Sequence, residues 1–120
     1  MNQKLAVVLL TAGTLLAADS IVTQARKKIA DKKYDEAITQ LDTAYKVKPQ
    51  PDVKRALGEA YVAKADSLMS DEALPPRAKY PAALRAYRHA LEMDKENKKA
   101  QQGISTIEGV YKSMGRPVPQ

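Results

Sequence analysis

The chain has 120 residues, a formal net charge of +6 and a hydrophobic content of 44%, which together indicate one small globular domain. It contains no cysteine, so disulfide bonds, thiol catalysis and cysteine-ligated metal sites are excluded. The positive charges are interleaved with Asp and Glu along the chain, which is typical of a solvated helical surface and does not by itself indicate an acidic partner.

The N-terminus has the three parts of a secretory signal peptide. A short basic start at residues 1–4 precedes an apolar run at residues 5–16, and the small residues Ala17 and Ala18 follow. The run is shorter than the stretch of about 20 apolar residues that a spanning helix needs, so we expect no stable transmembrane span. We expect cleavage near Ala18 and export to the periplasm or the extracellular space. The alternative is that the segment is retained as an apolar anchor.

Two helices are predicted in the first half of the remaining chain. From Asp19 or Ser20, either of which suits an N-cap, apolar residues recur at i and i+4 as far as about Lys32. A second helix is predicted at residues 34–47 with an apolar stripe of the same period. It ends before Pro49, because the residue that precedes a proline is disfavoured in the helical conformation.

Three further helices follow. The third is predicted at residues 51–69, with Gly58 in its interior as a point of close helix approach. Residues 70–79 contain adjacent prolines and are predicted as a long loop, so the fourth helix is expected at residues 80–94. The fifth is expected to start at an asparagine N-cap and to end before a glycine, at residues 97–114. Its apolar stripe consists of Ala100, Ile104, Ile107, Tyr111 and Met114.

An internal repeat relates residues 34–49 to residues 80–95. The same offsets hold an aromatic residue, an alanine, a large apolar residue and a second alanine in both segments. These positions are Tyr34, Ala37, Leu41 and Ala44 in the first and Tyr80, Ala83, Tyr87 and Ala90 in the second. A repeat of this length predicts a stacked array of similar helix pairs.

This pattern resembles the tetratricopeptide repeat, a helix pair of about 34 residues. Leu57, Gly58 and Tyr61 match the signature of its first helix, and the two repeated segments match its second helix. The resemblance covers residues 19–114. It implies an all-α solenoid of antiparallel helix pairs, about five helices in all, with a terminal capping helix. An extended tail is expected at residues 115–120.

In this family the first helix of each pair lines a concave groove that holds a peptide or a helix of a partner protein. Carried over by position, the groove candidates are Asp19, Val22, Arg26, Ile29, Asp52, Arg55, Glu59 and Val62. Members that clamp a C-terminal carboxylate pair Asn with Lys or Arg, and these positions offer no Asn, so that ligand class is not supported. A second set of candidate contacts lies in the predicted loop and comprises Leu74, Pro75, Pro76 and Arg77.

No residue pattern indicates catalysis, a cofactor or a metal. His89 is the only histidine and has no cysteine nearby, so we interpret it as a surface residue. Asp35 and Glu36 are interpreted as complements to a helix N-terminus rather than as a catalytic pair. Phenylalanine and tryptophan are absent and the tyrosines fall on core stripes, so nucleic-acid binding is not expected.

The sequence leaves two functions open. The first is an exported, non-enzymatic scaffold that binds a peptide or a partner protein in its groove. The second is a structural subunit that binds copies of itself, because an array shorter than three repeats has unfinished ends and head-to-tail contacts that do not close give a filament. The polar outer faces of both end helices argue against the second.

Overall fold

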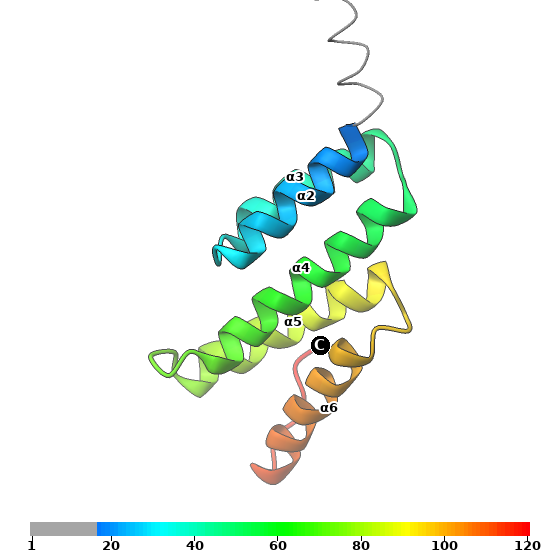
Figure 1. Cartoon of the computed structure of the whole chain (residues 1–120). Helices are drawn as coiled ribbons and strands as arrows, with labels where there is room; N and C mark the ends of the chain where they lie inside the picture. The colour runs from blue at the N-terminus through cyan, green and yellow to red at the C-terminus, as the bar shows by residue number, and fades with distance from the viewer. Residues whose placement is uncertain (1–16) are drawn as a thin grey trace, which may run out of the picture.

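The computed structural model of the protein describes residues 17–120, which form five α-helices with no strand in that part of the chain (Figure 1). The all-α class and the number of helices expected from the sequence are confirmed. The predicted signal peptide falls almost entirely in residues 1–16, outside the described part. Among the described helices, none has the length and hydropathy needed to cross a membrane. The helices are α2 (Ala17–Ala30), α3 (Tyr34–Val47), α4 (Pro51–Ser70), α5 (Pro76–Met93) and α6 (Lys98–Ser113).

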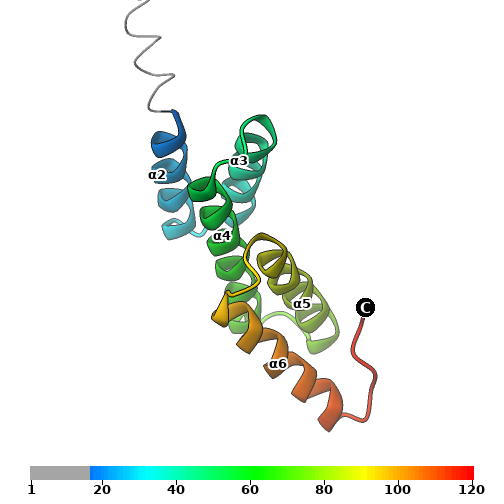
Figure 2. The same cartoon turned by 90° about the vertical axis from the view of Figure 1, so that its right-hand side faces the viewer.

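Consecutive helices run in opposite directions and pack against each other in chain order (Figure 1). Alternate helices also meet, but only on one side: α2 contacts α4 and α4 contacts α6, whereas α3 and α5 do not approach each other. The helices therefore form two layers. Figure 2 shows α2, α4 and α6 following one another on one side, and α3, α5 and the C-terminal tail on the other.

The core consists of two apolar clusters that share α4. The first joins α2, α3 and the N-terminal half of α4 around Leu41 and Leu57, which are almost fully buried. The second joins the C-terminal half of α4 with α5 and α6 around Leu84 and Ile107. Tyr61 is half-buried and packs against both clusters. Alanines at the helix crossings allow this close packing; those with no exposed surface are Ala25, Ala37, Ala56, Ala60, Ala65, Ala83, Ala90 and Ala100.

The repeated sequence positions are packing positions. Ala37 and Leu41 of α3 are buried, and so are the matching Ala83 and Tyr87 of α5. The aromatic residues that start each segment are half-buried. The repeat therefore specifies how α3 and α5 pack, and it leaves other surfaces of the chain to carry function.

The first helix differs from its predicted bounds at both ends. It begins at Ala17 rather than at the expected N-cap, Asp19 or Ser20, because alanine favours helix more than any other residue and extends the helix backwards. It ends at Ala30, earlier than expected. The turn that follows places Lys32 in the left-handed conformation, with φ at 63°. A residue in this conformation commonly ends a helix.

The long loop predicted after α4 is shorter than expected. The prediction that α5 starts near Tyr80 is wrong, since the helix begins at Pro76 and only residues 71–75 form the loop. Proline suits the first position of a helix because its φ is already helical and the missing N–H has no helical partner there. Pro81 then lies inside the helix. Its missing N–H affects only the carbonyl of Arg77, at the solvated start of the helix.

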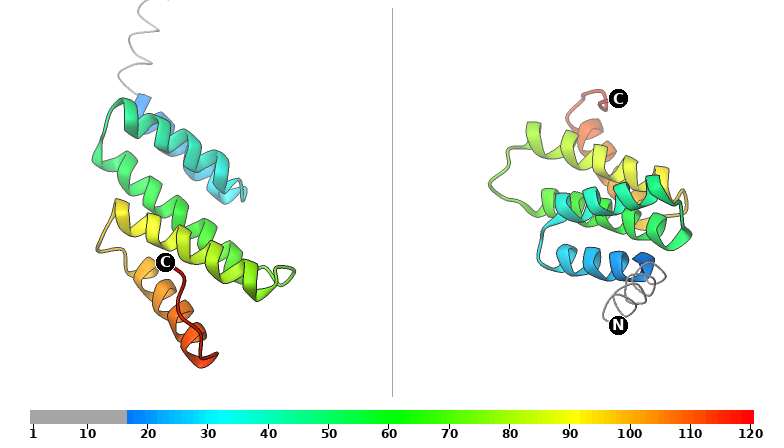
Figure 3. Two further views of the ribbon diagram at one scale, coloured as in Figure 1. Left: turned by 180° about the vertical axis from the view of Figure 1, so that it is seen from behind. Right: turned by 90° about the horizontal axis from the view of Figure 1, so that it is seen from above.

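The last helix begins as predicted and ends slightly earlier. The Asn97 side-chain Oδ1 accepts a hydrogen bond from the Ala100 N–H at 3.0 Å, which confirms the N-cap. Met114 is 46% exposed and lies just beyond the helix, so its assignment to the buried stripe is wrong. Gly115, with φ at 65°, reverses the chain. The extended tail folds back beside α6, and Val118 packs against the second core cluster (Figure 3).

Candidate partner-binding face

Several of the predicted groove residues lie together between α2 and α4. Val22 and Arg26 of α2 and Asp52 and Arg55 of α4 line one open cleft of about 320 Å³, together with Thr23. They meet because α2 and α4 are neighbours in the same layer, although α3 separates them in the chain. Thr23 was not a candidate in the sequence, since it is not one of the groove positions carried over from the repeat family.

Each arginine on this face is paired with a carboxylate. Arg26 Nε lies 3.5 Å from Glu59 Oε2, and this pair links α2 to α4. Arg55 Nη1 lies 3.6 Å from Asp52 Oδ1, one turn away on the same helix. All four side chains are substantially exposed, so each pair contributes at most about 1 kcal/mol to stability. The face therefore offers positively charged donors and negatively charged acceptors. A ligand can break either ion pair at a small cost in free energy.

The apolar groove candidates contribute little exposed surface. Val22 is 7% exposed and Val62 is 6% exposed, so Val22 forms only the floor of the cleft and Val62 belongs to the second core cluster. Ile29 is half-buried against the first cluster. These side chains are used in helix contacts, because α2 packs against α3 and α4, and α4 packs against all four other described helices. Asp19 lies in α2, but its side chain falls outside the described residues.

The predicted loop contacts lie in two different elements. Leu74 is half-buried and Pro75 is exposed, and both lie in the loop. Pro76 and Arg77 belong to the first turn of α5 instead. The shorter loop thus divides the four residues between the loop and the start of α5.

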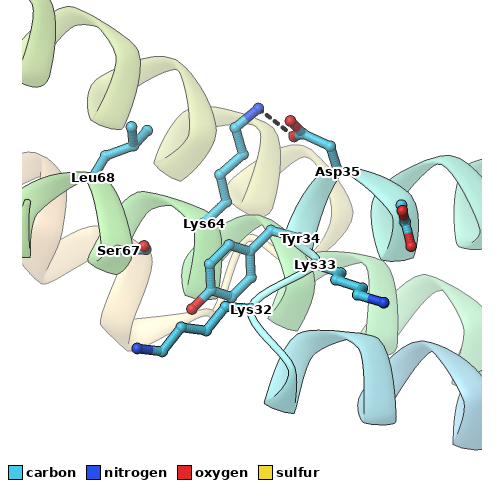
Figure 4. Close-up of a pocket in the computed structure, with 8 residues that line it drawn as sticks. Lys32, Lys33, Tyr34, Asp35, Lys64, Ser67 and Leu68 are labelled. Carbon is cyan, nitrogen blue, oxygen red and sulfur yellow. Dashed lines mark hydrogen bonds and ion pairs between the residues drawn. The ribbon is translucent and has the colours of Figure 1, made fainter.

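A second cleft of about 300 Å³ lies where the turn between α2 and α3 meets α4 (Figure 4). Lys64 Nζ of α4 lies 2.7 Å from Asp35 Oδ1 of α3 and closes one side of this cleft. Lys32 and Lys33 extend in opposite directions from the ring of Tyr34, as Figure 4 shows, so their charges do not converge on one point. Asp35 therefore also joins two helices, which the sequence did not indicate, since a pair between distant residues leaves no periodic signal.

His89 lies on the exposed side of α5, as expected, but its ring has defined neighbours. It stacks on Tyr61 with ring centroids 5.0 Å apart, and its Nδ1 lies 3.2 Å from Glu92 Oε2. Burial raises the pKa of the Tyr61 hydroxyl, and the negative charges of Asp42 and Glu92 act in the same direction. Nowhere in the described part of the chain do three or more His, Asp or Glu side chains gather as metal ligands would.

A third contact joins α4, α5 and α6. The Tyr87 O–H donates a hydrogen bond to Asp66 Oδ1 at 2.5 Å, and the Tyr87 ring lies against the backbone of Gly103. Burial raises the pKa of Tyr87, and the hydrogen bond to Asp66 raises it further, so the phenol remains a donor at neutral pH. The repeat pattern identified Tyr87, but neither Asp66 nor Gly103 occupied a position that it marked.

No family model, curated protein or solved structure matches this chain. Within the described residues, the face between α2 and α4 is where the largest number of predicted groove residues converge. It combines an open cleft with arginines and carboxylates on two helices. These groups provide charge-assisted hydrogen bonds of the kind that hold a polar peptide segment.

Proposed function

We propose that this chain is a non-enzymatic tetratricopeptide-type protein that binds a peptide or a partner protein on its partner-binding face. We define this face as Val22, Thr23, Arg26, Asp52, Arg55 and Glu59. The observation that carries the proposal is that the first five of these residues converge from two helices on one cleft, while Glu59 pairs with Arg26. In an array of helix pairs, the first helices form one layer whose side chains face a common groove. The contacts of α2 with α4 and of α4 with α6 support assigning these three helices to that layer.

The charges of the face favour one kind of ligand. Arg26 and Arg55 each have a carboxylate partner already, so a lone carboxylate must displace an existing pair. A peptide that carries both a basic and an acidic residue can replace both members of a pair at once and leaves no charge unpaired. We therefore propose a peptide segment of mixed charge as the ligand.

Charge reversal tests this face directly. Peptides are first selected from a displayed random library against the wild-type protein, and their affinities are measured by fluorescence anisotropy. Arg26→Glu combined with Arg55→Glu places four carboxylates on the face and is expected to weaken binding by at least about tenfold, or about 1.4 kcal/mol. Circular dichroism is expected to show unchanged helicity, because all of these side chains are exposed.

A matched control separates the face from net charge. Lys27→Glu combined with Lys98→Glu changes the charge by the same amount at exposed positions outside the cleft. This control is expected to bind like the wild type. Undiminished binding by the Arg26 and Arg55 variant would place the site elsewhere. A variant that combines Arg26→Glu with Glu59→Arg keeps the ion pair but exchanges the helices that carry its two charges. Wild-type affinity in this variant would show that the ligand needs the pair and not its direction.

Mass against concentration distinguishes partner binding from self-assembly. The outer surface of α6 carries Lys98, Gln102, Ser105 and Lys112, all exposed, and provides no apolar stacking surface. We expect light scattering to give the monomer mass over a wide concentration range. Growth of mass with concentration, without any added component, would favour the self-assembling structural subunit.

We further propose that the chain is exported and cleaved near Ala18. The support is the order of basic, apolar and small residues at the N-terminus of the sequence. Mass spectrometry of the protein from secreted or periplasmic fractions is expected to show a chain that starts close to Asp19. Recovery of only the full-length chain, in a membrane fraction, would instead support the retained apolar anchor.

A further inference from the structure

A row of arginines follows the outer side of α5. Arg77, Arg85 and Arg88 fall within about 80° of one another around the helix, at about 100° per residue. Arg77 and Arg85 are exposed and Arg88 is half-buried. Among the described side chains, none of the three has a carboxylate at ion-pair distance, whereas the two arginines of the partner-binding face both do. We call these three residues the α5 arginine row.

The side chains beside these arginines are short. Pro81 lies between the arginines around the helix and Ala78 lies about 20° beyond Arg85, at about 100° per residue. Ala78 is exposed and Pro81 is half-exposed. Short side chains here allow the backbone of a partner to come close to the helix. Pro81 lacks an N–H, so the carbonyl of Arg77 has no donor four residues on in the helix.

Charges near the row leave it positive. Glu92 lies on the same side of α5, toward the C-terminal end, and its carboxylate is engaged by His89 at 3.2 Å. Two exposed arginines and one half-buried arginine therefore lie on the same side of α5 as one carboxylate that already has a neighbour. Exposed like charges at this spacing repel one another weakly, and an acidic ligand relieves that repulsion.

The chemistry of the row favours carboxylates on a protein. A guanidinium group binds a carboxylate or a phosphate through two parallel hydrogen bonds. A single-stranded nucleic acid also needs exposed aromatic rings, and all six tyrosines of the chain are buried or half-buried. A membrane surface needs large apolar side chains to insert. The large exposed hydrophobic residues of the described part, Val47 and Met114, do not lie on α5.

We propose that the α5 arginine row is a second interaction surface and that it binds an acidic segment of a partner protein. Arg85 and Arg88 are one helical turn apart, and Arg77 lies about 16 Å from Arg88 along the axis at about 1.5 Å per residue. An acidic helix with carboxylates one turn apart and a further carboxylate about three turns away matches this spacing. Because α5 belongs to the other layer, the row and the partner-binding face can be occupied at the same time.

The test uses a defined acidic peptide as the probe. A labelled helical peptide of about 16 residues, with Glu at every third or fourth position and Ala between, is titrated against the whole chain by fluorescence anisotropy at about 50 mM salt, where screening is modest. An analogue with Gln in place of Glu serves as the neutral control. We expect the Glu peptide to bind and the Gln peptide not to bind. Failure of the Glu peptide to bind would overturn the proposal.

Matched variants then locate the binding. Arg77→Gln, Arg85→Gln and Arg88→Gln together are expected to weaken the Glu peptide by at least about tenfold. Lys95→Gln, Lys98→Gln and Lys99→Gln remove the same charge from exposed positions near α6 and are expected to leave affinity within about twofold. Equal losses in the two variants would show a diffuse charge effect and refute the row as a site. If the Gln variant lost helicity, the Arg→Lys triple variant, which keeps the charge and removes the planar fork, is expected to bind more weakly than wild type.

Two further probes decide the class of ligand. Vesicles that contain phosphatidylglycerol and a single-stranded oligonucleotide are titrated against the same proteins. Weak binding of both, relative to the Glu peptide, supports an acidic protein segment. Tighter binding of either one, with the same dependence on the three arginines, would overturn the choice of partner. Retention of Glu-peptide binding in the variant with Arg26 and Arg55 reversed would show that this surface stands independently of the proposed function.

Discussion

The contact between Gly103 and Tyr87 makes a quantitative prediction about packing. A Cβ atom at Gly103 would overlap the ring of Tyr87. The ring has little freedom to move aside, because Tyr87 is 4% exposed and its hydroxyl is bound to Asp66 at 2.5 Å. Gly109 lies in the same helix, and a Cβ there would meet nothing within 4 Å. Gly109→Ala is therefore a matched control for Gly103→Ala.

The expected magnitudes follow from two opposing effects. Replacing glycine by alanine in a helix interior stabilises it by about 1 kcal/mol, and this gain applies equally to both positions. For Gly109→Ala it is the whole effect. For Gly103→Ala the overpacking against the ring costs about 1–3 kcal/mol. The Gly103 variant should therefore be less stable than the Gly109 variant by about 1–3 kcal/mol. The gain in helix propensity is the same in both variants, so it drops out of this comparison.

Urea unfolding followed by circular dichroism measures both free energies of unfolding. A double-mutant cycle then assigns the cost to the ring, since Tyr87→Ala removes the atoms with which the new methyl group collides. In that background Gly103→Ala should stabilise the protein, as Gly109→Ala does. Equal stability of the two glycine variants in the wild-type background would refute the packing of Tyr87 on Gly103.

Three further predictions test local features. Lys32→Gly should stabilise the protein by about 1 kcal/mol in thermal unfolding, because glycine adopts the left-handed conformation without strain; destabilisation would contradict the turn geometry. Asn97→Ala should cost about 1 kcal/mol through loss of the N-cap bond to Ala100, and Asn97→Asp should restore it. The folded state raises the pKa of Tyr87 above the ordinary 10.0, so the stabilising effect of the neutral phenol is complete below about pH 10 and is lost as the pH rises further. Between about pH 9 and pH 11 the wild type should therefore lose more stability than Tyr87→Phe, and equal losses would exclude this linkage.

The helix bounds could be predicted where the apolar periodicity and a helix-terminating residue indicate the same end. The bounds of α3 match the prediction because its apolar stripe ends just before a proline. Proline was less informative at the start of α5, since a residue that breaks one helix also suits the first position of another. The sequence identified Pro75 and Pro76 as a boundary but placed the helix start at Tyr80 instead of Pro76.

The close contacts between helices were harder to predict. The sequence indicated Gly58 as a point of close approach, and α5 does approach it, yet a Cβ there would lie 3.6 Å from Met93 Cβ, an ordinary contact. The glycine that excludes a side chain is Gly103, where no repeat signature was recognised. Which glycine is required depends on the offset between neighbouring helices, and the spacing of residues along one helix does not specify that offset.

The candidate site could also be predicted only in part. The register of the repeat placed Arg26 and Arg55 on one side of α2 and α4, and both line the cleft. The carboxylate partners of these arginines could not be derived in this way, because the pair between Arg26 and Glu59 depends on the axial offset of α2 relative to α4. Sequence periodicity thus predicts the face of a helix, and the structure is needed to show which charges on that face are already satisfied.

The contacts of Tyr61 and Met93 link the two proposed surfaces. The partner-binding face belongs to α2 and the N-terminal half of α4, which pack with α3 in the first core cluster, whereas α5 packs mainly in the second and contacts the first through Met93. The helix α4 runs unbroken through both clusters for 20 residues, or about 30 Å. A continuous helix transmits orientation but does not bend easily, so binding at one surface should leave affinity at the other nearly unchanged. Any coupling is expected to pass through Tyr61 and Met93. Tyr61 packs against both clusters and stacks on His89 of α5, and Met93 of α5 packs against the first cluster.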